Sequence, residues 1–124
     1  MGEGDLFFCS TSGGRKKLGQ IFRLVPGRNR GPDQVELFFE SESLERDNLC
    51  VSPNGHLIVC EDQYTDVVDN HLRGITTTGE PYALGRLRLQ TELAGACFSP
   101  DGKWLFVNAY QPTRTLAITG PWAT

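Results

Sequence analysis

The chain has 124 residues, of which 39% are hydrophobic and 22% charged, and its formal net charge at pH 7 is -3. These values are typical of one globular domain that buries a core. Twelve Lys and Arg residues against fifteen Asp and Glu residues offer no basic surface to a phosphate backbone, so nucleic acid is not an expected partner. No apolar run approaches the about 20 residues of a membrane span, and none has signal-peptide length. We therefore expect no membrane partner, and the sequence assigns no compartment.

Short β-branched and aromatic runs alternate with turn residues along the whole chain, which holds 14 glycines and 7 prolines. No stretch keeps a helical period for three turns without Gly or Pro, and residues 40–46 are interpreted as a polar loop. The predicted strands, in chain order, are Asp5–Thr11, Gly19–Val25, Gln34–Glu40, Leu49–Ser52, His56–Asp62, His71–Thr77, Tyr82–Arg88, Ala94–Ser99, Trp104–Tyr110 and Thr113–Thr119. This pattern predicts an all-β protein of meandering antiparallel sheets.

One segment of the chain repeats. Cys50–Val59 aligns without a gap to Cys97–Phe106, at an offset of 47 residues, and each copy places Ser-Pro-Asn/Asp-Gly between two apolar strands. In such a turn Pro presets φ and Gly accepts the left-handed conformation, so Gly55 and Gly102 are predicted to be equivalent. A repeat of about 40 to 50 residues with about four strands is typical of a β-propeller blade. The alternative is two unrelated hairpins that share a common turn.

The blade count follows from the length of the repeat. A chain of 124 residues holds about 2.6 such repeats, whereas closed propellers have about four to eight blades. Residues 1–124 are therefore predicted to form a single partial β-propeller domain, an open arc of two to three antiparallel blades, with blade repeats near 49–62 and 96–108. The strands group as three, four and three, which leaves exposed edges on the end blades. We expect these edges to pair with a second copy, giving a homodimer.

Cysteine and histidine spacing excludes several kinds of site. The cysteines, at positions 9, 50, 60 and 97, include no Cys-x-x-Cys pair. The predicted hairpin makes Cys50 and Cys60 diagonal neighbours about 7 to 8 Å apart, too far for an unstrained disulfide, so all four are predicted to be reduced, mostly buried thiols. His56 and His71 have no second His or carboxylate at metal-binding spacing and are predicted to be non-catalytic. Gly13–Lys17 lacks the spacing of a phosphate loop and is predicted to be an exposed hairpin tip.

A series of motifs occurs in a fixed order along the chain. They are Cys9–Gly14, Gly19–Arg23, Phe39–Ser41, Asp47–Leu49, Ser52-Pro53, Leu57–Asp62, Ala94–Gly102, Leu105–Asn108 and Leu116–Trp122. In this order they resemble the C-terminal portion of the PhoX-type alkaline phosphatase family. The resemblance implies a β-propeller fold and a hydrolase of phosphoric esters, whose site in the central channel uses iron and calcium.

The resemblance also implies a set of oxygen ligands. They are Asp47, Asn48, Glu61, Asp62 and Asn108. Hard cations collect carboxylate and carbonyl oxygens, which is the chemistry these side chains offer. Calcium binding is expected to be weak, at about 10⁻⁴ to 10⁻³ M, and iron is expected from the resemblance only. No catalytic residue and no residue for an organic cofactor is predicted.

The sequence departs from the family pattern in its ligands. Arg46 stands where the family has Pro, and the family's Cys-Glu-Glu, acidic Glu-Arg and Arg-Pro-Glu-Asp segments are absent from these residues. Too few oxygens are then present to replace the hydration shell of several ions. The favoured hypothesis is a non-catalytic or remnant propeller fragment that serves as an assembly or interaction module. The alternative is a calcium- and iron-dependent phosphoric monoester hydrolase, active only with further N-terminal blades or a partner chain.

Each candidate ligand also has a purely structural interpretation. Asp47 and Asn48 could cap a loop with Asx-type hydrogen bonds. Glu61 and Asp62 could form a solvated strand end. The two interpretations differ in the burial and hydrogen-bond partners of these side chains.

Overall fold

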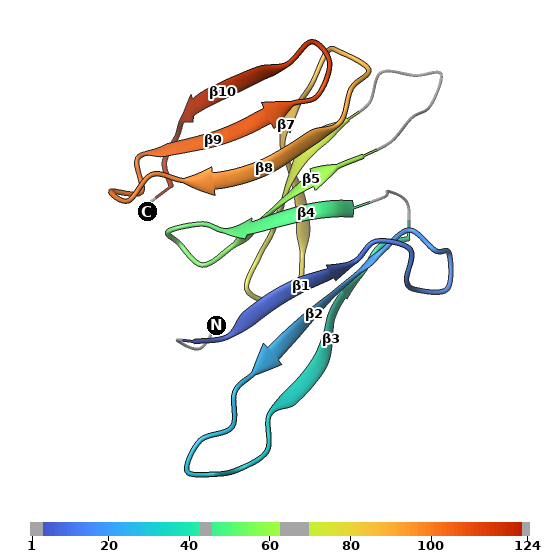
Figure 1. The fold of residues 1–124 in the computed structure, drawn as a ribbon, viewed down its shortest axis with the longest axis vertical. Helices are drawn as coiled ribbons and strands as arrows, with labels where there is room; N and C mark the ends of the chain where they lie inside the picture. The colour runs from blue at the N-terminus through green and yellow to red at the C-terminus, as the bar shows by residue number, and fades with distance from the viewer. Residues whose placement is uncertain (1–3, 43–45, 63–69, 123–124) are drawn as a thin grey trace. The chain divides into compact units, whose positions relative to one another are not determined.

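The computed structural model describes residues 4–42, 46–62 and 70–122, and these form strands and turns without a helix (Figure 1). The strands are β1 (Leu6–Ser10), β2 (Gln20–Val25), β3 (Gln34–Glu40), β4 (Arg46–Val51), β5 (Leu57–Glu61), β6 (His71–Ile75), β7 (Pro81–Arg86), β8 (Leu93–Phe98), β9 (Trp104–Ala109) and β10 (Arg114–Thr119). The described part of the chain contains no helix of the length and apolarity that a membrane span requires. The all-β prediction is confirmed.

The strands form three separate antiparallel sheets, with the orders β1-β2-β3, β4-β5-β6-β7 and β10-β9-β8. Within each sheet, hydrogen-bonded neighbours are strands that follow one another along the chain, as in an antiparallel meander. The predicted grouping of three, four and three strands is confirmed. The largest difference in extent is at β4, which begins at Arg46 rather than at Leu49, so Asp47 and Asn48 lie within a strand and not in a loop.

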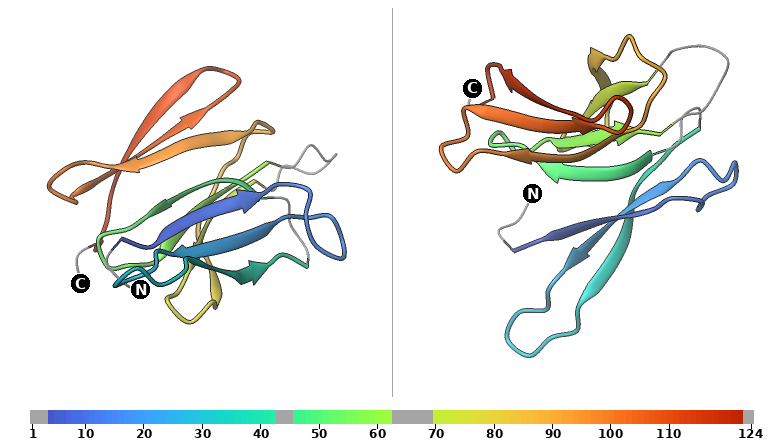
Figure 2. Two further views of the ribbon diagram at one scale, coloured as in Figure 1. Left: turned by 60° about the horizontal axis from the view of Figure 1, so that its bottom comes forward. Right: turned by 45° about the horizontal axis from the view of Figure 1, so that its top comes forward.

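The chain divides into two compact units, Met1–Arg46 and Asp47–Thr124, and each is described by itself. The first unit is the sheet β1-β2-β3, shown in blue and teal in Figure 2. Ile21 on its central strand is 0% exposed and pairs with Cys9 and Phe39 on the two flanking strands. On β2 the guanidinium of Arg23 bonds Asp5 at 2.5 Å and Glu36 at 3.1 Å, which ties the edge strands to the centre.

The core of the second unit lies between the two sheets β4-β5-β6-β7 and β10-β9-β8. Along β9 the buried residues alternate with more exposed ones, because successive side chains of a strand point to opposite faces. The buried apolar residues of this cluster are Ile58, Cys60, Leu72, Leu93, Ala96, Leu105, Val107, Ala109 and Trp122. β5 is buried over its full length, as expected of a strand inside a sheet. The two sheets are therefore stabilised by burying an apolar face of each against the other.

The two repeated turns have the same local structure. Gly55 and Gly102 have φ values of 84° and 70°, and each donates its N–H to the carbonyl of the turn's Ser at 2.9 Å. In each turn the Ser hydroxyl also donates to the side-chain oxygen of the residue at the third position, Asn54 or Asp101. The first turn pairs Ser52 with His56, whereas the second turn is one residue longer and pairs Ser99 with Trp104. The predicted equivalence of the two glycines is confirmed.

Replacing either turn glycine with Val is expected to lower the free energy of unfolding by about 1 to 3 kcal/mol, since a β-branched residue is poorly tolerated at positive φ. Gly102→Val should cost more, because a Cβ there would lie 3.0 Å from Pro53, whereas at Gly55 the nearest atom, on Thr77, is 3.7 Å away. Thermal melts of both variants measure the effect. Gly85→Val is the matched control, since a Cβ at Gly85 meets no atom within 4 Å. Melts that all overlay the parent would contradict the expectation.

All four cysteines are thiols in the structure. Cys60 is fully buried, Cys9 and Cys50 are half-buried, and Cys97 is exposed, so the prediction that the thiols are mostly buried is wrong. The exposure of Cys97 has a simple cause. Its neighbour Ala96 faces the core, and alternation along β8 turns Cys97 to the outer face of the sheet.

The thiols of the second unit are expected to differ in reactivity. Burial, with a smaller contribution from the neighbouring Cys97, raises the pKa of Cys50 to about 11. At pH 8 only about one Cys50 side chain in a thousand is then a thiolate, which is the nucleophilic form. Mass-spectrometric mapping after a short iodoacetamide pulse at pH 8 should find Cys97 modified and Cys50 unmodified. Labelling of Cys50 should rise about tenfold for each pH unit above pH 8. Equal labelling of the two thiols at pH 8 would show that Cys50 is not held in this environment.

Candidate functional site

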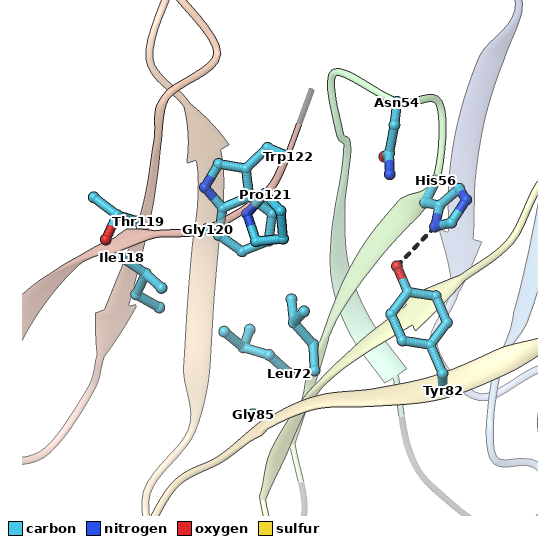
Figure 3. A pocket seen from close by; sticks show the side chains of 11 residues that line it. Asn54, His56, Leu72, Tyr82, Gly85, Ile118, Thr119, Gly120, Pro121 and Trp122 are labelled. Atoms are coloured by element: carbon cyan, nitrogen blue, oxygen red, sulfur yellow. Dashed lines mark hydrogen bonds between the residues drawn. The ribbon is translucent and has the colours of Figure 1, made fainter. Parts of the chain in front are cut away.

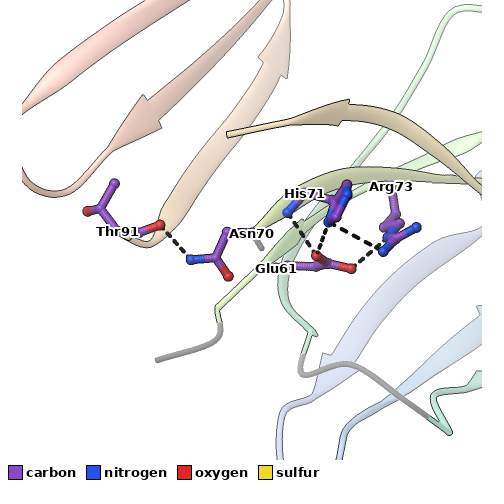
Figure 4. A network of polar contacts seen from close by, with 5 residues as sticks. All are labelled: Glu61, Asn70, His71, Arg73 and Thr91. Atoms are coloured by element: carbon purple, nitrogen blue, oxygen red, sulfur yellow. Dashed lines mark hydrogen bonds and ion pairs between the residues drawn. The ribbon is translucent and has the colours of Figure 1, made fainter. Parts of the chain in front are cut away.

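The carboxyl end of β5 carries a buried cluster of ionisable side chains. The register of the β5–β6 pair places Glu61 beside His71 and near Arg73. Glu61 Oε1 accepts a hydrogen bond from Nε of Arg73 at 2.7 Å, and Oε2 accepts one from the backbone N–H of His71 at 2.8 Å (Figure 4). The imidazole Nδ1 of His71 lies 3.2 Å from the same Oε2. Both carboxylate oxygens are thus engaged by residues of the neighbouring strand.

The electrostatics of this cluster follow from its burial. The side chain of Glu61 is 0% exposed, that of His71 13% and that of Arg73 21%. A carboxylate without access to water is stable only when it is paired and hydrogen-bonded, and the Arg73 guanidinium supplies both. The interpretation of Glu61 as a solvated strand end is therefore wrong. The negative charge of Glu61 is balanced by the positive charge of Arg73 inside the protein.

The proton on His71 can be placed in two ways. With hydrogen on Nδ1, the imidazole donates to Glu61; with Nδ1 unprotonated, it accepts from Nη2 of Arg73, 3.4 Å away. The shorter contact is to Glu61 and reinforces the carboxylate's hydrogen bonds. Either arrangement holds the ring against the other two side chains.

A second pair of buried polar residues anchors the start of β6. Asn70 is 1% exposed, and its side-chain amide donates to the carbonyl of Thr91 at 2.8 Å (Figure 4). The backbone carbonyl of Asn70 accepts from Leu87, and the Thr91 hydroxyl accepts from the N–H of Gln111 at 2.7 Å. These bonds join the strand that carries His71 to the segment leading into β8. The acid cluster is thereby built on a rigid part of the second unit.

The predicted ligands occupy different sheets. Asp47 and Asn48 lie on β4, Glu61 and Asp62 at the end of β5, and Asn108 on β9. The side chain of Asp47 lies outside the described part of the structure. Asn108 is exposed and accepts a hydrogen bond from Thr115 at 2.8 Å, on the side of its sheet that faces away from the core. Asn108 and the buried Glu61 are therefore not brought together.

These positions bear on the expected metal ions. A cation at Glu61 would compete with the Arg73 guanidinium, because both carboxylate oxygens already accept hydrogen bonds. Among the residues that the structure describes, no three His, Cys, Asp or Glu side chains are grouped so as to hold a metal ion. The described residues as arranged here do not fit a calcium or iron site. Calcium and iron binding stay predictions.

Sequence reasoning missed the partners of Glu61. His71 was expected to lack a carboxylate at a useful spacing, yet the structure places one 3.2 Å from its ring. Nine residues separate Glu61 from His71 in the sequence, and they do not specify the register of the two strands. No motif of fixed spacing could therefore predict the contact. The signal that was available is the hairpin itself: in antiparallel strands the last residue of one lies beside the first of the next.

The fold and the site define an all-β protein of short antiparallel meanders that carries a buried acid–base cluster. A family model described as "Alkaline phosphatase PhoX" matches residues 1–113. The chain therefore belongs to the PhoX alkaline phosphatase family, which confirms the resemblance seen in its motifs. Comparison with curated proteins gave no match, and neither did comparison with solved structures.

Proposed function

We propose that this chain is a PhoX-family β-propeller fragment that serves as an assembly module, with its three sheets acting as blades. Sheets of three to four antiparallel strands have the size of propeller blades. The equivalent turns at Gly55 and Gly102, 47 residues apart, support a blade repeat. Unpaired edges on such sheets favour association with another chain.

The observation that carries this proposal is an exposed apolar face on the first unit. The face has two cross-strand rows, one of Leu6, Leu24 and Val35 and one of Phe8, Phe22 and Leu37. The exposed fractions of Leu6, Phe8, Val35 and Leu37 are 58%, 46%, 60% and 51%. Continuous apolar surface of this kind is typical of an interface and not of a free surface.

A second copy of the chain is the occupant that we propose for this apolar face. Within the second unit, two sheets of the same protein already bury faces rich in Leu, Ile and Val against each other. The same sheet-on-sheet packing between copies would bury the face on the first unit. The proposed state is a homodimer, and the face adds to the contact expected from the strand edges.

Light scattering coupled to size-exclusion chromatography tests the assembly proposal at micromolar concentration. The parent is expected at twice the chain mass, and Leu37→Lys at the mass of one chain, because an ammonium group cannot be buried at an apolar interface without a partner. Gln34→Lys is the matched control, since it adds the same charge to the opposite face of β3 and should leave the dimer intact. A monomeric parent would overturn the proposal.

A second candidate function is favoured by family membership. In this alternative the chain contributes oxygen ligands to a calcium- and iron-dependent hydrolase of phosphoric monoesters and requires further ligands from a partner chain. The ligands proposed for it are Asp47, Asn48, Glu61, Asp62 and Asn108. Bound cations would supply neutralisation of the phosphoryl charge. The contact between Glu61 and Arg73 weighs against tight binding by this chain alone.

Calcium titration tests the second candidate. Because Arg73 competes for Glu61, the dissociation constant for calcium is expected near the weak limit of about 10⁻³ M. At a calcium concentration ten times that value the stabilisation is RT ln 11, about 1.4 kcal/mol, which should raise the melting temperature by a few degrees. Asp47→Ala should abolish this rise, whereas Glu80→Ala, at an exposed turn, should not. A flat response to 10 mM calcium, with no turnover of 4-nitrophenyl phosphate when iron and calcium are supplied, would remove this candidate.

A further inference from the structure

The second unit contains a pocket whose lining includes none of Glu61, His71 and Arg73. Its volume is about 510 Å³, within the range of about 300 to 1,000 Å³ that is typical of small-molecule sites. His56 and Tyr82 form one wall, the segment Gly120–Trp122 after β10 forms another, and Leu72 lies between them (Figure 3). Each wall carries an aromatic ring.

Glycines determine where both aromatic rings lie. The Tyr82 ring covers Gly74 so closely that a methyl group on Gly74 would overlap it, and its hydroxyl is hydrogen-bonded to Nδ1 of His56 at 2.8 Å. The Trp122 indole covers Gly120, where a Cβ would lie 2.8 Å from the ring, and it packs edge-to-face on Phe98 with the ring centroids 5.5 Å apart. Both walls are thus held in place before any ligand arrives, which lowers the entropic cost of binding.

Among the residues that the structure describes, the lining of the pocket includes no Asp, Glu, Lys or Arg. Its polar side-chain groups are the amide of Asn54, the imidazole of His56, the hydroxyls of Tyr82 and Thr119 and the indole N–H of Trp122. Burial raises the pKa of Tyr82, so this phenol is neutral at physiological pH. The Nε1–H of Trp122 is buried and has no hydrogen-bond partner within the described residues. Such a surface offers hydrogen bonds and ring contacts but nothing that compensates the desolvation of an ion.

We propose that this pocket binds a neutral, ring-bearing small molecule whose hydroxyl group hydrogen-bonds with the hydroxyl of Tyr82, which is itself held by His56. A hydroxyl both donates and accepts, so it matches this pair in either tautomer of the imidazole. The ring is held between the Tyr82 and Trp122 walls over Leu72. None of the described lining residues is a Lys or Arg that could pair with a phosphoric ester, so the ligand that we propose is not such an ester. The inference therefore does not depend on the metal-dependent function proposed above.

2-Naphthol is a suitable probe, because it is fluorescent, uncharged at pH 7 and carries one hydroxyl. Equilibrium titration by fluorescence anisotropy should show saturable binding at one site per chain, with a dissociation constant of about 10⁻⁴ M for a ligand of this size. 2-Naphthyl phosphate should not compete. A parent that shows no saturable binding, or a phosphate ester that competes as well as 2-naphthol, would overturn the proposal.

Gly85→Leu blocks the pocket directly. Gly85 lines it, and a Cβ there meets no atom within 4 Å, so the new side chain enters open space without disturbing the strand. Binding of 2-naphthol is expected to weaken at least tenfold. Ala83→Leu is the matched control, since it adds the same apolar side chain to β7 at an exposed position outside the pocket lining, and it should leave binding unchanged. Equal binding by both variants would place the probe elsewhere and overturn the proposal.

Tyr82→Phe tests the hydrogen bond while keeping the ring. The affinity for 2-naphthol is expected to fall about fivefold, the equivalent of one neutral hydrogen bond, whereas the affinity for naphthalene, which lacks the hydroxyl, should not change. A parallel thermal melt checks that the variant is folded. Loss of affinity for both probes to the same extent would contradict the assigned role of the Tyr82 hydroxyl.

Discussion

Arg73→Ala is expected to lower the free energy of unfolding of the second unit by about 3 to 5 kcal/mol. The variant leaves the Glu61 carboxylate, which is 0% exposed, without its guanidinium partner at 2.7 Å. An unpaired buried charge keeps its desolvation cost and loses the compensating attraction. Chemical denaturation measures the change, and in a unit of this size it corresponds to a fall in melting temperature of more than about 10 °C.

Two further variants separate this effect from other causes. Arg114→Ala removes an exposed Arg from β10 and should change the free energy of unfolding by no more than about 0.5 kcal/mol. Adding Glu61→Gln to Arg73→Ala should recover part of the loss, because the neutral amide is cheaper to bury than the carboxylate. If Arg73→Ala melts with the parent, the Glu61 cluster does not exist in the form described.

Leu105→Ala is expected to lower the free energy of unfolding by about 2 to 5 kcal/mol, through lost apolar burial and the cavity that remains. Leu105, the second residue of β9, is 0% exposed and belongs to the core cluster between the two sheets. Chemical denaturation again measures the change. Leu89→Ala is the control: this residue lies in the same unit and is 40% exposed, and its truncation should have little effect. Equal losses in the two variants would show that the core does not lie between these sheets.

The contact between Arg73 and Glu61 affects how strongly the acid cluster would bind a cation. A cation bound at Glu61 would compete with the positive charge of Arg73 for the same carboxylate. A partner that bound Arg73 and separated it from Glu61 would leave the Glu61 carboxylate available, still accepting a hydrogen bond from the backbone N–H of His71 at 2.8 Å. We therefore expect calcium to raise the melting temperature of Arg73→Ala more than that of the parent. A smaller shift in the variant would indicate that the cation binds elsewhere.

The strands and turns of this protein were determined by local sequence. All of the predicted strands are present, and most of their ends differ from the prediction by one or two residues. The reason is that alternating apolar residues, Gly and Pro act within a few positions of the chain, as at Gly55 and Gly102. The grouping into sheets of three, four and three strands also agrees with the prediction from the blade repeat.

The sites were decided by tertiary structure. Glu61 meets His71 and Arg73 only through the register of two strands separated by a long connection, and the residues between them do not encode that register. The exposure of Cys97 and the orientation of Asn108 depend on which face of their sheet packs against its neighbour. The pocket likewise needs Tyr82 over Gly74 and Trp122 over Gly120, which are pairings of side chain and backbone across space. Sequence patterns act over one strand or one turn, whereas burial and charge pairing depend on the packing of several strands at once.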